Sequence, residues 1–154
     1  MSTQGIVVQP GQGPMANYTP GRSIILKLQC DETADSIMMF EATAPSGARS
    51  TLHLHHDSDE VAYVLRGEFT FLIGGDVTIG GPGTCAFMPR GVRHAWKNTG
   101  AEAGLVLFLY TPARAGRLIE EQQRTGSNFS SMTETDRAEM LRHYGWELLG
   151  PSPL

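Results

Sequence analysis

Charged residues, cysteines and long hydrophobic runs are all scarce in this chain of 154 residues. Only 18% of the residues are charged, the formal net charge is −4, and no basic stripe is present to neutralise phosphates, so we do not expect nucleic-acid binding. No apolar run is long enough to predict a membrane span. The N-terminus lacks the basic segment followed by an apolar stretch that marks a signal peptide. We therefore expect a cytoplasmic protein.

Cysteine occurs only twice, at Cys30 and Cys85. The two positions lie far apart in the sequence and do not have the spacing of a metal-binding pair. A disulfide between them remains an alternative, but a cytoplasmic location favours two reduced, buried thiols.

Glycine and proline, in contrast, are abundant, with 18 and 9 residues. This composition is typical of many short strands joined by turns rather than of a helical bundle. Turn signals recur about every 8–12 residues, the spacing expected of a sandwich or barrel. The predicted strands are Ser23–Gln29, Ser36–Thr43, Ser50–His55, Glu60–Leu65, Glu68–Ile73, Val77–Ile79, Cys85–Met88, Arg93–Asn98 and Leu105–Tyr110. The first two flank a polar turn, which predicts a hairpin.

The chain divides into three parts. Residues 1–22 form an irregular lead-in with one possible short strand at Ile6–Val8, and residues 23–112 form a β-barrel. Residues 113–154 form a helical extension that packs on the barrel, since this segment is too short for a core of its own. Its predicted helices are Arg114–Arg124 and Asp136–Tyr144. The fold class is therefore all-β with a short helical tail.

Two blocks of fixed spacing carry the residues with the most distinctive chemistry. The blocks read Gly47-x5-His53-x-His55-x4-Glu60-x6-Gly67 and Gly83-x5-Pro89-x-Gly91-x2-His94-x3-Asn98. Side chains alternate along a strand, so His53 and His55 share one face, and a barrel could bring Glu60 and His94 to the same interior point. Three imidazoles and one carboxylate suit a first-row transition metal. The alternative, buried histidines satisfied by the core, explains the shared spacing less well.

Both blocks resemble the two sequence motifs of the cupin superfamily. The resemblance implies a double-stranded β-helix, which is a jelly-roll barrel. It also implies one divalent transition metal, either Fe, Mn, Ni, Co, Cu or Zn, held by His53, His55, Glu60 and His94. Some cupins keep the carboxylate off the metal, so a catalytic role of Glu60 as acid or base stays open.

The substrate pocket is expected next to this site. Trp96 and Tyr110 are candidates for its lining, although single aromatic residues in strands more often belong to the core. Ala62 and Val64 share the face of Glu60 and are the other two candidates. His56 should lie on the outer face. Leu52 and Leu54 would make that face apolar, which favours a homodimer.

Residues 59–69 and 89–94 extend the similarity to cupins, and residues 142–151 resemble a cupin subgroup often labelled quercetin 2,3-dioxygenase-like. This resemblance implies an oxidoreductase, a metal-dependent dioxygenase that acts on a small enol or phenol. Two other hypotheses remain: a metal-dependent isomerase, decarboxylase or cyclase that uses no oxygen, and a non-catalytic small-molecule-binding protein.

Overall fold

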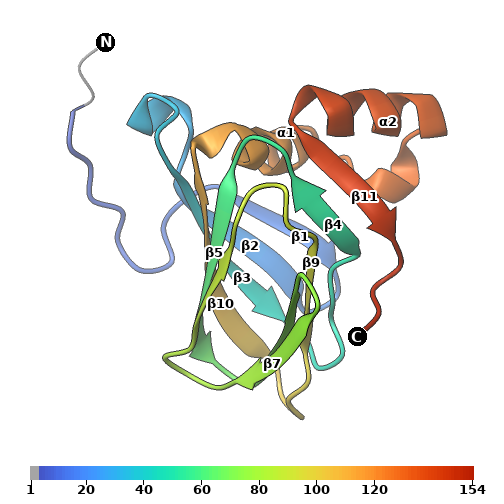
Figure 1. Ribbon diagram of the computed structural model, residues 1–154. Coiled ribbons are helices and arrows are strands. Elements are labelled where there is room, and N and C mark those ends of the chain that lie inside the picture. The colour runs from blue at the N-terminus through green and yellow to red at the C-terminus, as the bar shows by residue number, and fades with distance from the viewer. Residues whose placement is uncertain (1–3) are drawn as a thin grey trace.

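A computed structural model describes residues 4–154, and within this range the strands form two facing antiparallel sheets that enclose a barrel (Figure 1). One sheet has six strands in the order β1-β2-β3-β10-β5-β8, and the other has five in the order β11-β4-β9-β6-β7. The strands are β1 Met15–Thr19, β2 Arg22–Leu28, β3 Met38–Ala44, β4 Leu52–His55, β5 Asp59–Arg66, β6 Phe69–Ile73, β7 Asp76–Gly80, β8 Cys85–Met88, β9 His94–Asn98, β10 Gly104–Thr111 and β11 Trp146–Gly150. The predicted all-β jelly roll is confirmed.

The six-stranded sheet shows why these residues form strands around a core. Buried and less buried residues alternate along β3 and along β10, so one face of each strand points into the barrel. Phe40 of β3 and Phe108 of β10 are paired in register, and their rings stack with centroids 5.3 Å apart. The predicted hairpin of β2 and β3 is also present. This aromatic pairing forms one wall of the barrel interior.

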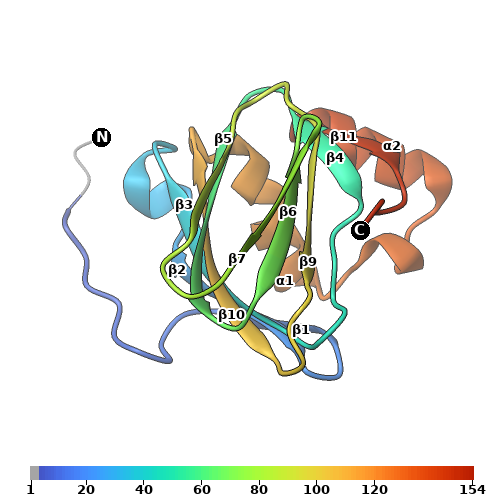
Figure 2. The same ribbon diagram turned by 60° about the horizontal axis from the view of Figure 1, so that its bottom comes forward.

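The opposite sheet joins strands that are distant in the sequence. β9 pairs with β6 along its whole length, from Phe69↔Asn98 to Ile73↔His94. On its other side β9 meets β4 through the pair His53↔His94. Figure 2 shows the two sheets facing each other from a second direction. The crossover from β4 through β5 to β9 therefore places both sequence blocks on the barrel interior.

The C-terminal extension contains the predicted helices, now observed as α1 Gly116–Thr125 and α2 Glu134–His143, at one end of the barrel in Figure 1. Three short 3-10 turns, at Asp31–Thr33, Ala113–Ala115 and Phe129–Ser131, complete the helical elements of the described chain. Leu118 of α1 is fully buried, which anchors that helix to the barrel. None of the helices within residues 4–154 is sufficiently long and apolar to span a membrane.

The prediction of a purely helical extension was wrong, because the chain ends in strand β11. This strand pairs antiparallel with β4, with Trp146 opposite His55 and Leu148 opposite His53. Gly145 has φ +73°, and its carbonyl accepts a hydrogen bond from the His56 amide at 2.8 Å. A single alternating segment of five residues gives only a weak strand signal, and it becomes a strand here because the edge of β4 is open.

The lead-in also differs from its prediction. The structure has no strand at Ile6–Val8, where Ile6 and Val7 are exposed and no neighbouring strand offers a partner. A strand forms instead at β1, which pairs with β2. The Lys27 ammonium group holds the preceding loop by donating hydrogen bonds to the carbonyls of Gln9 and Gln12. Pairing with a neighbour, rather than local hydrophobicity, decides which segment becomes a strand.

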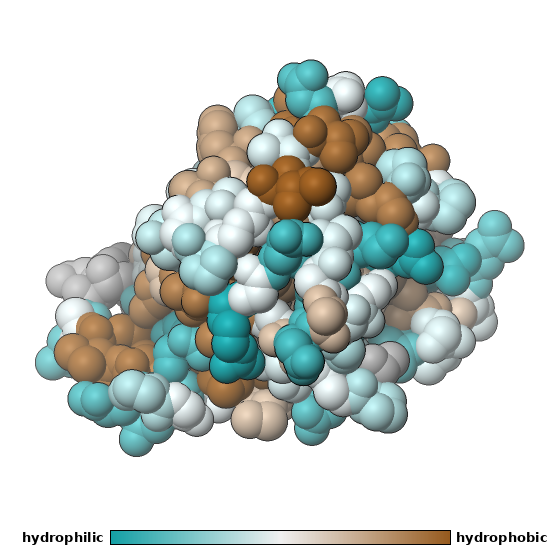
Figure 3. Space-filling model, turned by 90° about the horizontal axis from the view of Figure 1, so that it is seen from below, coloured by the Kyte–Doolittle hydropathy of each residue, from teal (hydrophilic) through white to brown (hydrophobic). Residues whose placement is uncertain are grey.

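The two thiols lie in different environments, and neither is in a disulfide. Cys30 is buried, as predicted, but Cys85 is exposed, so the prediction for that thiol was wrong. Cys85 is on β8, at the edge of its sheet, where residues alternate between the core and solvent. Phe87 on the same strand and Val77 and Ile79 on β7 are also exposed. Figure 3 shows hydrophobic residues at the surface when the molecule is seen from below, gathered mainly in the upper part of that view.

Candidate metal centre

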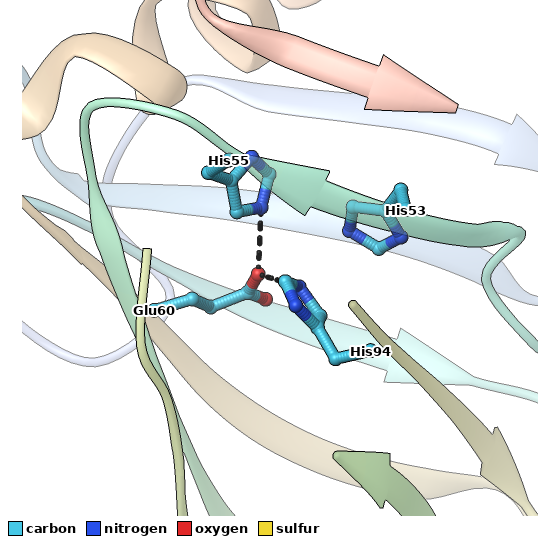
Figure 4. A group of neighbouring side chains, drawn as sticks. All are labelled: His53, His55, Glu60 and His94. Carbon is cyan, nitrogen blue, oxygen red and sulfur yellow. Dashed lines mark hydrogen bonds and ion pairs between the residues drawn. The ribbon is translucent and has the colours of Figure 1, made fainter. Parts of the chain in front are cut away.

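Four buried side chains from three strands point toward one another inside the barrel (Figure 4). His53 and His55 come from β4, Glu60 from β5, and His94 from the start of β9. One ligand atom from each of the four lies within 4.8 Å of all the others. The structure thus brings together all four residues that the spacing and the resemblance singled out.

Backbone contacts around the two blocks fix the strand ends that carry these side chains. The Gly91 amide donates a hydrogen bond to the His55 carbonyl at 2.7 Å, which ties the turn before β9 to the end of β4. Gly67 follows β5 with φ +90°, and a Cβ there would lie 2.9 Å from the Gly104 Cα. A side chain at that position would therefore meet both backbone strain and a steric clash.

The hydrogen bonds of the imidazoles leave suitable nitrogens facing the cluster. The Nδ1 atoms of His53 and His94 donate to the carbonyls of Thr51 and Val92, at 2.8 Å and 2.9 Å. This orients Nε2 of each ring inward, and a second hydrogen bond of this kind is a common support for metal-binding histidines. Glu60 Oε2 accepts hydrogen bonds from Nε2 of His55 and His94 at 2.9 Å and 3.0 Å. Nδ1 of His55 is buried and has no hydrogen-bond partner in the part of the chain that the structure describes.

The electrostatics of the cluster favour the metal-binding protonation state at His53, His55 and Glu60. Burial lowers the pKa of His53 to about 4 and also lowers the pKa of His55. Burial alone would raise the pKa of Glu60, but hydrogen bonds from His55 and His94 hold it well below its ordinary value. Burial lowers the pKa of His94, yet the hydrogen bond and charge of Glu60 outweigh this effect and the net shift is upward. Neutral His53 and His55 and ionised Glu60 are in the forms that bind a metal, and His94 would release a proton on binding; the donor set fits a divalent transition metal.

Trp146 supports the cluster from the C-terminal strand. Its ring stacks on His53 with centroids 5.1 Å apart and an interplanar angle of 9°, and its edge contacts His55 at 4.2 Å between centroids. The indole Nε1 donates to the Ala115 carbonyl at 2.9 Å, which fixes the ring. Sequence reasoning missed this residue because β11 was not predicted, although alternation after Gly145 was the available signal.

A cavity of about 360 Å³ adjoins the cluster and is lined by His53 and Glu60. Trp96 and Tyr110, the two aromatic candidates, also line it. Ala62 and Val64 are fully buried and, within the described chain, are not on the cavity wall. Ala62 lies in register between Phe108 of β10 and Ala86 of β8, so these neighbouring strands enclose it in the core.

Several further wall residues were not predicted. They come from the segments on either side of the barrel sequence, β1 and β2 at one end and the helical extension at the other: Tyr18, Arg22, Leu118, Gln122, Phe129 and Trp146. His56, in contrast, is exposed and bonded through Nε2 to the Glu147 carboxylate at 2.9 Å, on the outer face as predicted. His143 is also exposed.

Solved structures with a similar fold come from several bacteria. KdgF from a Halomonas species is 21% identical, with a TM-score of 0.63, and the alignment covers 71% of this chain and 94% of that one. A predicted oxalate decarboxylase from Thermotoga maritima is 20% identical, with a TM-score of 0.64 and coverage of 69% and 98%. A sugar phosphate isomerase of the cupin superfamily from Silicibacter pomeroyi is 20% identical, with a TM-score of 0.58 and coverage of 69% and 75%. These identities establish a shared fold alone.

No curated protein matches the sequence. A family model described as cupin domain matches residues 40–110, a range that contains His53, His55, Glu60 and His94. The matched range, the two-sheet barrel and the converging ligand set agree with one another. Residues 40–110 of this chain therefore form a cupin domain.

Proposed function

We propose that this cupin is a metal-dependent enzyme, a quercetinase-like dioxygenase that oxidises a small enol or phenol. The observation that supports this most strongly is the position of the ligand set. Three imidazoles and a carboxylate converge beside an aromatic cavity of about 360 Å³, a size suited to a small organic molecule.

The residues of this chain would divide the work between holding the substrate and handling its proton. Trp96, Phe108 and Tyr110 line the cavity with aromatic side chains, which suit a planar substrate. Glu60 reaches the same cavity and could accept the proton of the substrate hydroxyl. A divalent metal held by the four ligands would supply Lewis acidity, which favours the deprotonated, electron-rich substrate that reacts with dioxygen.

Oxygen uptake by the metal-loaded protein tests this proposal. The full chain would be loaded separately with Fe(II), Mn(II), Ni(II) or Co(II), its metal content measured, and oxygen followed with flavonols and diketones as substrates. We expect uptake with at least one metal and its loss in Glu60→Ala. Absence of uptake with every metal, in protein shown to be loaded, would contradict a dioxygenase.

A second candidate is a metal-dependent isomerase, decarboxylase or cyclase that consumes no oxygen. It is favoured by structural neighbours whose names include an isomerase and a predicted decarboxylase. Turnover of a substrate under strictly anaerobic conditions would identify this class. Tight ligand binding without any turnover would instead favour a non-catalytic binding protein.

We also propose that the chain forms a homodimer. Leu52 and Leu54 are only half-buried on the outer side of β4. Exposed Val77, Ile79 and Phe87 add further apolar surface. Sedimentation at micromolar concentration should give the mass of two chains, whereas a mass of one chain would contradict this proposal.

A further inference from the structure

One wall of the cavity carries a positive charge that has no counterion within residues 4–154. Arg22, at the start of β2, lines the cavity, and its guanidinium carbon lies 5.5 Å from the centre of the Trp96 ring. Its one hydrogen bond in the described chain is a long one, 3.5 Å, to the Arg49 carbonyl. No Asp or Glu of the described chain forms an ion pair with it.

Other arginines of the chain are used differently. Arg90 binds both carboxylate oxygens of Asp59, and Arg117 pairs with Asp31 and Asp35. Arg49, which also lines the cavity, donates to the Leu154 carbonyl at 2.8 Å. Arg22 is thus the cavity arginine that makes only one long hydrogen bond within the described chain, although a guanidinium carries five N–H groups.

A second unused donor lies next to it on the β1–β2 hairpin. Tyr18 lines the same cavity, and its buried hydroxyl oxygen has no hydrogen-bond partner among the described residues. Burial raises the pKa of Tyr18 to about 12, so this hydroxyl stays neutral and can donate. An unpaired buried hydroxyl and a half-buried, unpaired guanidinium are both costly without a ligand. The Tyr18 hydroxyl and the Arg22 guanidinium would both donate hydrogen bonds to an anion.

We propose that Arg22 and Tyr18 form a carboxylate pocket, so that the substrate of the metal site is a small planar acid bearing an enol or phenol hydroxyl. This inference rests on the proposed function for the role of the hydroxyl, but its carboxylate recognition is independent of oxygen chemistry. One free guanidinium matches the single charge of a carboxylate and its flat, bidentate geometry.

The walls between the two sites suit a flat molecule. Phe40 and Phe108 stack, and the Trp96 and Phe108 ring centroids lie 5.6 Å apart. Tyr110 lines the cavity beside the metal ligands, since it is paired in register with Glu60 and its ring centroid lies 5.2 Å from that of His55.

Calorimetric binding to the full chain loaded with Zn(II), which does not change oxidation state, tests the carboxylate pocket apart from turnover. The probes are salicylate and 1-hydroxy-2-naphthoate, each compared with its neutral amide. Wild-type protein should bind the acids at least tenfold more tightly than the amides. Arg22→Gln should remove most of that preference, about a tenfold loss or more for the acids and less than twofold for the amides. Tyr18→Phe should weaken the acids by a smaller factor.

Arg66→Gln provides the matched control, since it removes the charge of an exposed arginine that does not line the cavity; the preference for acids should remain. Each variant would first be checked for its circular dichroism and bound Zn(II). An equal loss for acids and amides in Arg22→Gln would show that Arg22 only packs on Trp96 and would overturn the proposal. No binding of either acid, no preference for acids in the wild type, or tighter binding of phenyl phosphate would also overturn it. The binding experiment does not depend on oxygen uptake. Failure of the dioxygenase proposal would therefore leave the preference for acids unchanged.

Discussion

The metal-ligand cluster, defined as His53, His55, Glu60 and His94, and the carboxylate pocket, Arg22 and Tyr18, line one cavity but are built in different ways. The cluster comes from strands β4, β5 and β9 of the barrel, between positions 53 and 94 of the sequence. The carboxylate pocket comes from the N-terminal β1–β2 hairpin, and the rest of the wall comes from barrel strands and from the C-terminal extension. The metal-ligand cluster is therefore part of the barrel itself, which we call the frame. The carboxylate pocket is added by a peripheral segment, a term that we use for the N-terminal hairpin and the C-terminal extension. Peripheral segments can vary without changing the metal ligands, which is how one fold can serve different substrates.

The largest effect, a loss of metal affinity, is expected when a metal ligand on the barrel is replaced. His94→Ala deletes an inward Nε2 and leaves Glu60 with one imidazole partner. We expect metal affinity to fall at least about 100-fold, beyond the 10–100-fold cost of losing a residue that merely supports a ligand. Elemental analysis of purified protein measures this directly. His143→Ala, at an exposed position on α2, is the control and should keep its metal; equal metal content in the two variants would refute the ligand assignment.

A smaller effect is expected for Trp146, where strand β11 of the C-terminal extension contacts the metal-ligand cluster. Trp146→Ala removes the ring that stacks on His53, contacts His55 and donates to Ala115. Since Trp146 is half-buried, the loss should be about 2–3 kcal/mol of unfolding free energy, below the range for a fully buried tryptophan. Metal affinity should also fall, by about tenfold.

Urea denaturation of the metal-free protein measures the stability change, and a Co(II) titration measures the affinity. Leu149→Ala, on the same strand but 41% exposed, should change each by little. If Trp146→Ala loses stability with unchanged affinity, β11 stabilises the fold without positioning the metal ligands.

The sequence predicted the frame far better than the periphery, for physical reasons. Strand alternation fixed the common face of His53 and His55, and the spacing of the two blocks brought Glu60 and His94 into the argument. By contrast, β1 and β11 have little local signal and become strands because β2 and β4 offer open edges. Arg22 and Trp146 therefore could not be assigned to the site before tertiary structure was known. Cys85 was misjudged because the exposed face of edge strand β8 cannot be read from composition.

The smallest effect is on the pH dependence of stability and concerns Tyr18, on the N-terminal hairpin. Burial raises the pKa of Tyr18 from 10.0 to about 12 in the folded protein. A raised folded pKa means that this stabilisation is complete below pH 10 and is lost as the pH rises toward 12, because the unfolded chain releases the proton first. Tyr18→Phe should therefore reduce the alkaline loss of stability between pH 9 and pH 11 by about 1 kcal/mol.

Urea midpoints at pH 9, 10 and 11 give this difference. Tyr63→Phe serves as the control, because Tyr63 is 41% exposed. The same pH dependence in wild-type protein and Tyr18→Phe would show that the hydroxyl is solvated in the folded state.

The central claim, that the barrel frame holds a transition metal, is tested most directly by anomalous scattering from crystals of the metal-loaded full chain. Data collected at the absorption edge of the bound element should show one strong peak per chain, within bonding distance of Nε2 of His53, His55 and His94 and of a Glu60 carboxylate oxygen. A metal-saturated protein that shows no peak between these four side chains, or shows its peak elsewhere, would contradict the account.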